Sequence, residues 1–138
     1  MEVSSKLLSN CIKIEPDVLK VIDAWGYTFK TVAFVWVKQN KSGKGFFFGL
    51  GHWTRSNAEI CLLAVKGRPK RVSKKVHQLI ISPIEGHSKK PDMARDKIIE
   101  LMGDLPKVEL FARQNSAGWD AWGNEVGHSI SIGHMNRK

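Results

Sequence analysis

Residues 28–38 read TFKTVAFVWVK, and this run of β-branched and aromatic residues predicts the strand that decides the fold class. Apolar side chains occupy both of its alternating faces, as in a central strand that is covered on two sides. Shorter apolar runs predict further strands at 59–66, 78–82 and 108–113. The sequence therefore predicts a sheet with one long central strand.

Two helices are predicted around these strands. Pro16 suits a first helical position and Gly26 a helix stop, so one helix precedes the central strand. A second helix is predicted from about Pro91 to Met102, where apolar residues recur at helical spacing before Gly103. Strands that alternate with helices indicate an α/β sheet with flanking helices. In such a sheet, functional loops lie beyond the carboxyl ends of the strands.

The length and composition suit one domain. The chain has 138 residues, of which 42% are hydrophobic. We expect an irregular or displaced start over residues 1–14, a domain over 15–127 and a flexible tail over 128–138. Two isolated cysteines and no signal-like or membrane-spanning run favour a soluble cytoplasmic protein with no membrane partner. The five histidines lack metal-ligand spacing, so we expect no metal site.

The net charge is +9, from 22 basic and 13 acidic side chains. Such a surplus favours a nucleic-acid partner, because neutralised phosphates release counterions. The alternative is that the charge only keeps the protein soluble. Basic residues concentrate in a connector over 67–75, which we expect to project as a flexible arm whose Lys70 and Arg71 contact phosphates. The alternative there is a solvated loop.

A second segment, residues 45–57 (GFFFGLGHWTRSN), joins aromatic side chains to a guanidinium and an amide. Stacking surfaces beside a guanidinium suit an unpaired or flipped base, so Trp53, Arg55 and Asn57 are candidates for substrate binding. For Phe46–Phe48 we expect a small core beneath the loop instead. The glycines do not have the spacing of a dinucleotide-binding fingerprint.

A third group of side chains lies at the end of the predicted strand at 108–113 and directly after it. Phe111, Arg113, Gln114 and Asn115 come first, and GWDAWGNE at 118–125 follows. At the carboxyl edge of a sheet these groups would hold a nucleoside-bearing cofactor, with an amide or carboxylate on the ribose hydroxyls. The alternative is an ordinary turn with surface tryptophans, although two tryptophans are costly to expose.

Five runs in a fixed order carry a resemblance to a known family. They are AWGYTFKTVAFVWVK, GLGHWTRSNAEICLLAVKG, HSKKPD, KVELFAR and GWDAWGNEV. Together, from Trp25 to about Gly127, they resemble the family named for the seventy-kilodalton methyltransferase-A subunit. Its eukaryotic members methylate adenine in messenger RNA, and its bacterial and phage members are DNA adenine methyltransferases. The TRSNAEICLLA and FAR forms resemble the bacterial and phage branch.

The resemblance implies a Rossmann-like S-adenosylmethionine-dependent methyltransferase sheet, incomplete at its N-terminus. It implies methyl transfer to the exocyclic 6-amino group of adenine in nucleic acid, with DNA favoured over RNA. It also implies roles for residues at matching positions. The cofactor residues would be Lys90, Phe111, Arg113, Gln114, Asn115, Asn124 and Glu125, and the substrate residues would include Trp53, Arg55, Asn57 and Glu59.

One motif of the family has no counterpart in this sequence. Relatives carry an Asp-Pro-Pro-Trp-type segment that orients the adenine amine against the sulfonium methyl. Here proline follows neither aspartate nor asparagine anywhere, and the preceding strand is also missing. We therefore name no catalytic residue and expect that a second chain or a second copy completes the sheet. The alternatives are an inactive nucleic-acid-binding remnant and a phage-type regulator that reuses the fold.

Overall fold

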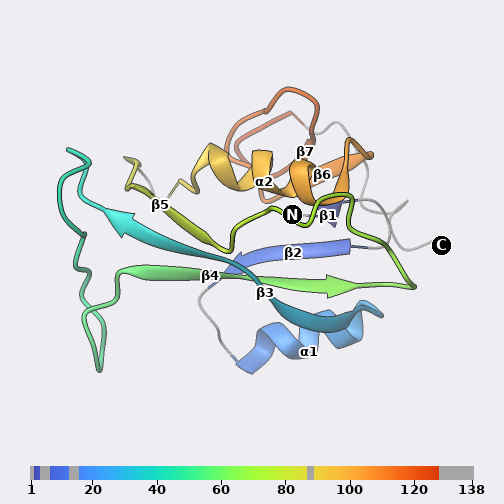
Figure 1. Ribbon diagram of the computed structural model, residues 1–138, viewed down its shortest axis with the longest axis horizontal. Helices are drawn as coiled ribbons and strands as arrows, with labels where there is room; N and C mark the ends of the chain where they lie inside the picture. Colours follow the sequence, from blue (N-terminus) through green and yellow to red (C-terminus); the bar gives the residue numbers. More distant parts are fainter. Residues whose placement is uncertain (1, 4–6, 13–15, 87–88, 128–138) are drawn as a thin grey trace.

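The computed structural model describes residues 2–3, 7–12, 16–86 and 89–127. Within these ranges seven strands form one mixed sheet in the order β5-β3-β4-β2-β1-β6-β7 (Figure 1). The α/β class expected from the sequence is confirmed. The elements are β1 (Glu2–Val3), β2 (Leu7–Ile12), α1 (Pro16–Ala24), β3 (Thr28–Gln39), β4 (Ala58–Val65), β5 (Leu79–Pro83), α2 (Asp92–Met102), β6 (Lys107–Leu110) and β7 (Asp120–Trp122).

The long strand β3 has a neighbour on each side, as its two apolar faces predict. It pairs antiparallel with β4, from Thr28 opposite Val65 to Val37 opposite Ala58. Its last five residues pair in parallel with β5. Because β3 and β4 run in opposite directions, the loop 40–57 and the connector 66–78 leave the sheet at opposite ends (Figure 1).

The first residues of the chain also join the sheet. We expected an irregular or displaced start over 1–14, but residues 2–3 and 7–12 form strands β1 and β2. β2 pairs antiparallel with β4 over six residues, and β1 pairs with both β2 and β6. These two short strands therefore connect the β3–β4 half of the sheet to the β6–β7 half. The tail expected over 128–138 lies outside the described residues.

The pairing directions bring several strand ends to one edge of the sheet. β2, β3, β5, β6 and β7 all run in the same direction, while β4 and β1 run in the opposite one. We call the edge where these five strands end the carboxyl edge, and the opposite one the amino edge. β6 ends at Leu110 rather than at 113 because Phe111 adopts a left-handed backbone conformation, with φ of 57°. β7, where the sequence predicts no strand, pairs in parallel with β6.

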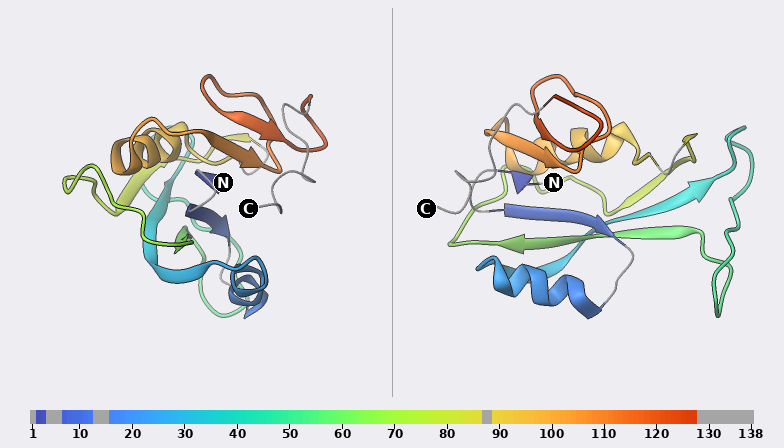
Figure 2. Two further views of the ribbon diagram at one scale, coloured as in Figure 1. Left: turned by 90° about the vertical axis from the view of Figure 1, so that its right-hand side faces the viewer. Right: turned by 180° about the vertical axis from the view of Figure 1, so that it is seen from behind.

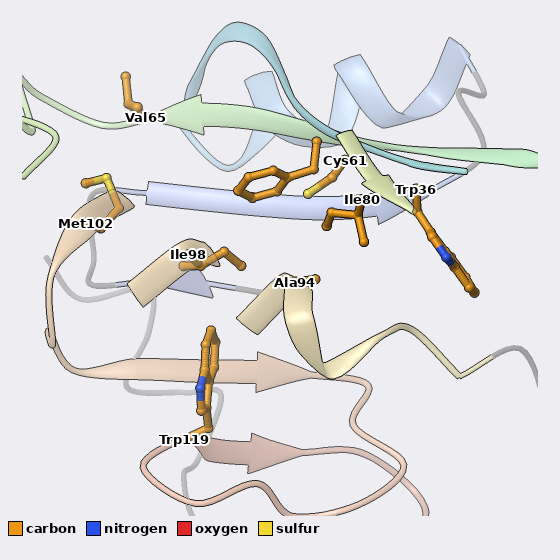
Figure 3. Packing of buried hydrophobic residues seen from close by; sticks show 9 residues of the cluster. Trp36, Cys61, Val65, Ile80, Ala94, Ile98, Met102 and Trp119 are labelled. Carbon is orange, nitrogen blue, oxygen red and sulfur yellow. The ribbon is translucent and has the colours of Figure 1, made fainter. Parts of the chain in front are cut away.

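The helices cover opposite faces of the sheet (Figure 2). On one face, Val18 and Ile22 of α1 pack with Leu62 of β4. On the other face, Ile98 of α2 packs with Ile80 of β5 and with the rest of the larger core (Figure 3). The remaining members of this larger core are Phe34, Trp36, Cys61, Val65, Ala94, Met102 and Trp119.

A largely buried ion pair fastens α2 to β6. Arg95 is only 8% exposed, and its Nε and Nη2 atoms donate to the two carboxylate oxygens of Glu109, at 2.8 and 2.9 Å. Its third nitrogen, Nη1, donates to Asp92 at 2.8 Å. This two-pronged geometry fixes direction as well as distance. It holds the start of α2 beside the end of β6, at the carboxyl edge.

Candidate functional site at the carboxyl edge of the sheet

A cluster of three charged side chains lies where β3 ends and β4 begins. Glu59 accepts from Lys38 Nζ at 2.6 Å through one carboxylate oxygen and contacts Lys90 Nζ through the other. The Glu59 side chain is only 12% exposed. Both ammonium groups also lie near the ring of Trp36, at 5.1 Å and 6.0 Å from its centroid. We call these three charged residues the Glu59 cluster.

The two lysines keep Glu59 ionised. Burial of the carboxyl raises its pKa, but hydrogen bonds and charge from Lys38 and Lys90 outweigh burial, and the net pKa lies below its ordinary value. An ionised, doubly paired carboxylate is a poor proton donor. With two positive charges and one negative charge, the cluster is positive overall and suits a polar or anionic ligand. Lys90, Pro91 and Trp36 also line one small cavity with Glu59.

The loop between β3 and β4 presents its aromatic side chains to solvent. Trp53 is 98% exposed, and Arg55 is exposed beside it in the sequence. The small core expected for Phe46–Phe48 is wrong, because Phe46 and Phe48 are 49% and 59% exposed. The loop is too narrow to enclose a core. Gly49 N donates to Ser56 O at 2.9 Å, and a Cβ at Gly51 would lie 1.9 Å from Thr54 O.

Phe111 directly follows β6, and the residue is 74% exposed. Its ring meets Trp122 of β7 edge-to-face, at 5.3 Å between centroids. A left-handed conformation at a non-glycine residue costs of the order of 1–3 kcal/mol and is found most often at functional sites. Here it turns the chain at the carboxyl ends of two parallel strands and leaves an aromatic face open.

The turn after β7 lies against the chain that follows Phe111. Ala112 N donates to Trp122 O at 2.9 Å. A Cβ at Gly123 would lie 2.3 Å from Ala112 O, so only glycine permits this approach. The next two residues, Asn124 and Glu125, are exposed in the turn.

The tryptophans in this region are not surface residues. Trp119 is 8% exposed and belongs to the larger core, while Trp122 is half-buried. The alternative of an ordinary turn with surface tryptophans is therefore wrong. Arg113, Gln114 and Asn115 are exposed in the loop that leads to Trp119.

The structure brings most of the predicted site residues to the carboxyl edge, in two groups. The first group, around Glu59, comprises Trp53, Arg55, Asn57, Glu59 and Lys90. The second group follows β6 and β7 and comprises Phe111, Arg113, Gln114, Asn115, Asn124 and Glu125. Strands β2 and β1 separate the two groups within the sheet, and the start of α2 bridges them, from Lys90 to Arg95.

Two predicted residues are not part of this edge. Lys70 and Arg71 lie on the connector after β4, at the amino edge. The expected projecting arm is also wrong, because Val72 N donates to Leu101 O of α2 at 2.8 Å and ties the connector to the helix. A phosphate contact by Lys70 and Arg71 therefore cannot be made together with a ligand contact by Glu59 unless the ligand spans the domain.

Sequence reasoning missed two members of the carboxyl edge. Lys38 pairs with Glu59, and Trp36 lies beneath both lysines. The sequence signal for Lys38 is its place at the end of an otherwise apolar strand. A lysine that is partly buried there needs an acidic partner. Among the described residues no group of three His, Cys, Asp or Glu could hold a metal ion. No helix in the described ranges has the length and apolar character to cross a bilayer.

An aromatic ring, exposed polar turns and a positive cluster lie together at the carboxyl edge, which is where open α/β sheets bind their ligands. The model of one family, MT-A70, matches residues 9–125, and the chain belongs to the MT-A70 family.

Relatives at 30–40% identity are methyltransferases. The Type II methyltransferase M.MunI of Mycoplasma sp is 39% identical over 106 residues, which cover 75% of this chain and 42% of that protein. The N(6)-adenosine-methyltransferase MT-A70-like protein of Arabidopsis thaliana is 32% identical over 109 residues, which cover 76% of this chain and 16% of that protein. The crystal structure of M1.HpyAVI has 18% identity and a TM-score of 0.46, covering 75% of this chain and 52% of that one. The chain thus spans less than half the length of these two sequence relatives.

The Glu59 cluster predicts a pH-dependent contribution to stability. Glu59→Gln removes the charge that two lysines share, so the free energy of unfolding should fall by about 1–3 kcal/mol near pH 7. A lowered folded pKa means that the wild-type advantage is present above the unfolded pKa and is lost as the pH falls through the folded pKa. Urea denaturation of both proteins from neutral to acidic pH measures this difference.

Glu85→Gln is the matched control, because Glu85 makes an exposed pair with Lys89. It should leave the free energy of unfolding near the wild-type value across the same range. A difference between wild type and Glu59→Gln that stays constant down to acidic pH would contradict the assignment.

Proposed function

We propose that this chain binds S-adenosylmethionine and nucleic acid for methyl transfer to the exocyclic 6-amino group of adenine. The observation that carries the proposal is Phe111, an exposed aromatic in a left-handed conformation at the carboxyl ends of parallel strands β6 and β7. In open α/β sheets this is where nucleoside cofactors bind. Membership of the MT-A70 family supports the same reading.

The residues around Phe111 fit the chemistry of the cofactor. The open face of the ring suits stacking against adenine. Asn124 and Glu125 offer an amide and a carboxylate to ribose hydroxyls, and Arg113 offers a guanidinium to the carboxylate of the amino-acid part. When bound, the cofactor supplies an activated methyl group on its sulfonium. We assign to this chain's residues the binding and orientation of that group.

The loop before β4 fits the acceptor. Trp53 and Arg55 are exposed and suit stacking on an unpaired base, and Asn57 lies where the loop enters β4. Lys90 pairs with Glu59 beside this loop and directly precedes α2, the helix whose Arg95 pairs with Glu109 of β6. We propose DNA as the acceptor, because the segments TRSNAEICLLA and FAR resemble the bacterial and phage branch of the family.

The sequence contains no Asp-Pro-Pro-Trp-type segment, the motif that in relatives orients the adenine amine. We propose that further protein, as a second chain or a second copy, supplies the orienting group. The competing function is binding of nucleic acid without catalysis. The missing Asp-Pro-Pro-Trp-type segment favours this competing function. Cofactor binding at the carboxyl edge distinguishes methyl transfer from binding without catalysis.

Calorimetric titration with S-adenosylhomocysteine tests the cofactor proposal. Wild type should bind, and Arg113→Ala and Asn124→Ala should each weaken binding about threefold to thirtyfold, because each removes a polar contact to the ligand. Arg68→Ala, at the amino edge, is the matched control and should leave the affinity unchanged. Wild-type protein that fails to bind, or two site variants with wild-type affinity, would refute the proposed placement.

Measurements of DNA binding distinguish the stacking contribution of Trp53 from the charge contribution of Lys70 and Arg71. We expect Trp53→Ala to weaken binding of an adenine-containing single strand by about 1–3 kcal/mol without changing the salt dependence. The double change Lys70→Gln and Arg71→Gln should instead make the slope of log affinity against log salt shallower, by up to about 1.4 for a single strand. Fluorescence anisotropy over a range of salt concentrations measures both quantities. A slope that the double change leaves as in wild type would remove Lys70 and Arg71 from the nucleic-acid surface.

A further inference from the structure

A pocket of about 470 Å³ lies on the amino-edge half of β3 and β4. Its floor is the face of β3 and β4 that α2 leaves uncovered, and its walls come from the end of α2 and from the connector. The apolar lining residues are Val32, Ala33, Phe34, Leu63, Val65, Pro69, Val76, Leu101 and Met102. A volume of this size is in the range of small-molecule sites.

The connector forms a fixed roof over this pocket. Val72 N donates to Leu101 O at 2.8 Å, which joins the connector to the last turn of α2. Further along, Gln78 Nε2 donates to Val32 O at 3.0 Å, which joins it to β3. Val76, between these two attachments, is half-buried against the larger core. The pocket is therefore lined by β3 and β4, by the end of α2 and by the connector, all of which belong to this chain.

The charged groups on the rim all have the same sign. Lys30, Arg68 and Arg71 line the pocket beside the apolar residues. The ion pairs found among the described residues involve none of these three side chains. A low-dielectric wall beside three unpaired cations creates a positive potential that attracts an anion.

We propose that this pocket binds a small amphipathic anion, with an apolar body of about the size of a medium-length alkyl chain and one acidic head group. The aliphatic walls would take the apolar body, and Arg68 and Arg71 would pair with the head group, as guanidinium groups pair with carboxylates.

Two other occupants fit less well. A nucleobase would leave the polar edges of its ring unpaired against valine and leucine, which costs free energy. The chain's own residues 128–138 contain two basic and no acidic residues, so they repel the same rim.

The charged rim of the pocket lies away from the Glu59 cluster. Lys30 of the rim precedes Lys38 of the cluster by eight residues along β3, roughly 26 Å in an extended strand, while Phe34 lines both the pocket and the small cavity beside Glu59. Binding at the amino edge therefore does not need the cofactor or nucleic acid, and it can be measured without either.

Three probes of the same chain length test the proposal: decanoate, decanol and decyltrimethylammonium. Titrated calorimetrically below their micelle concentrations at about 150 mM salt, decanoate should bind most tightly. The cation should bind at least about tenfold more weakly, because it meets the positive rim. Equal affinities for decanoate and the cation, or tighter binding of adenosine monophosphate than of decanoate, would overturn the proposal.

Matched variants locate the binding. Arg68→Gln with Arg71→Gln should weaken decanoate about tenfold and leave decanol unchanged, because only the head-group contact is lost. Lys74→Gln with Lys75→Gln, on the same connector but outside the lining, should leave both affinities unchanged. Ala33→Leu, which places added side chain in the pocket, should abolish binding of both probes while circular dichroism confirms the fold. Decanoate affinity that survives both the double arginine change and Ala33→Leu would contradict the site.

Discussion

The start of α2 is held to two separate parts of the sheet, and the arrangement of the carboxyl edge depends on those two attachments. Lys90, just before the helix, pairs with Glu59 of β4, and Arg95, in its first turn, pairs with Glu109 of β6. Among the described residues, only β2 and the two-residue strand β1 lie between β4 and β6 in the sheet. The helix therefore links the proposed acceptor loop to the proposed cofactor turn in addition to the pairing within the sheet.

The buried Arg95–Glu109 pair differs from an exposed ion pair in the free energy that is lost when one partner is removed. The Lys20–Asp17 pair has both side chains more than three-quarters exposed, and such pairs are worth about 0–1 kcal/mol. Arg95 and Glu109 are largely buried, so loss of either partner leaves an unpaired charge that costs about 3–5 kcal/mol. Net stability from such a pair is small, because desolvation offsets most of the attraction. Its main effect is to fix where α2 lies on the sheet.

The parts of the fold that the sequence predicted are those with a strong local pattern. The strand at 28–38 and the helix at 91–102 have long apolar periodicities, and the structure places both close to those bounds. β1, β2 and β7 have two to six residues and form through pairing with distant strands, which no local pattern encodes.

In the candidate site, too, the sequence predicted the residues that follow a local pattern and missed those that depend on tertiary contacts. Phe111, Arg113 and Asn124 could be found because they follow apolar strands at an edge where polar groups are exposed. The positions of Phe46 and Phe48, and the folded-back course of the connector, depend on tertiary contacts such as Val72 with Leu101. The pairing of Lys38 with Glu59 depends on the antiparallel register of β3 and β4, in which Trp36 lies opposite Glu59.

We propose that the cofactor binds at the carboxyl edge, away from the connector at the amino edge. Amide chemical-shift mapping during titration with S-adenosylhomocysteine tests that placement most directly. We predict shifts at Phe111–Asn115, at Gly123–Glu125 and around Lys90, with residues 67–75 unchanged. Shifts confined to 67–75, or spread evenly over both edges, would contradict it.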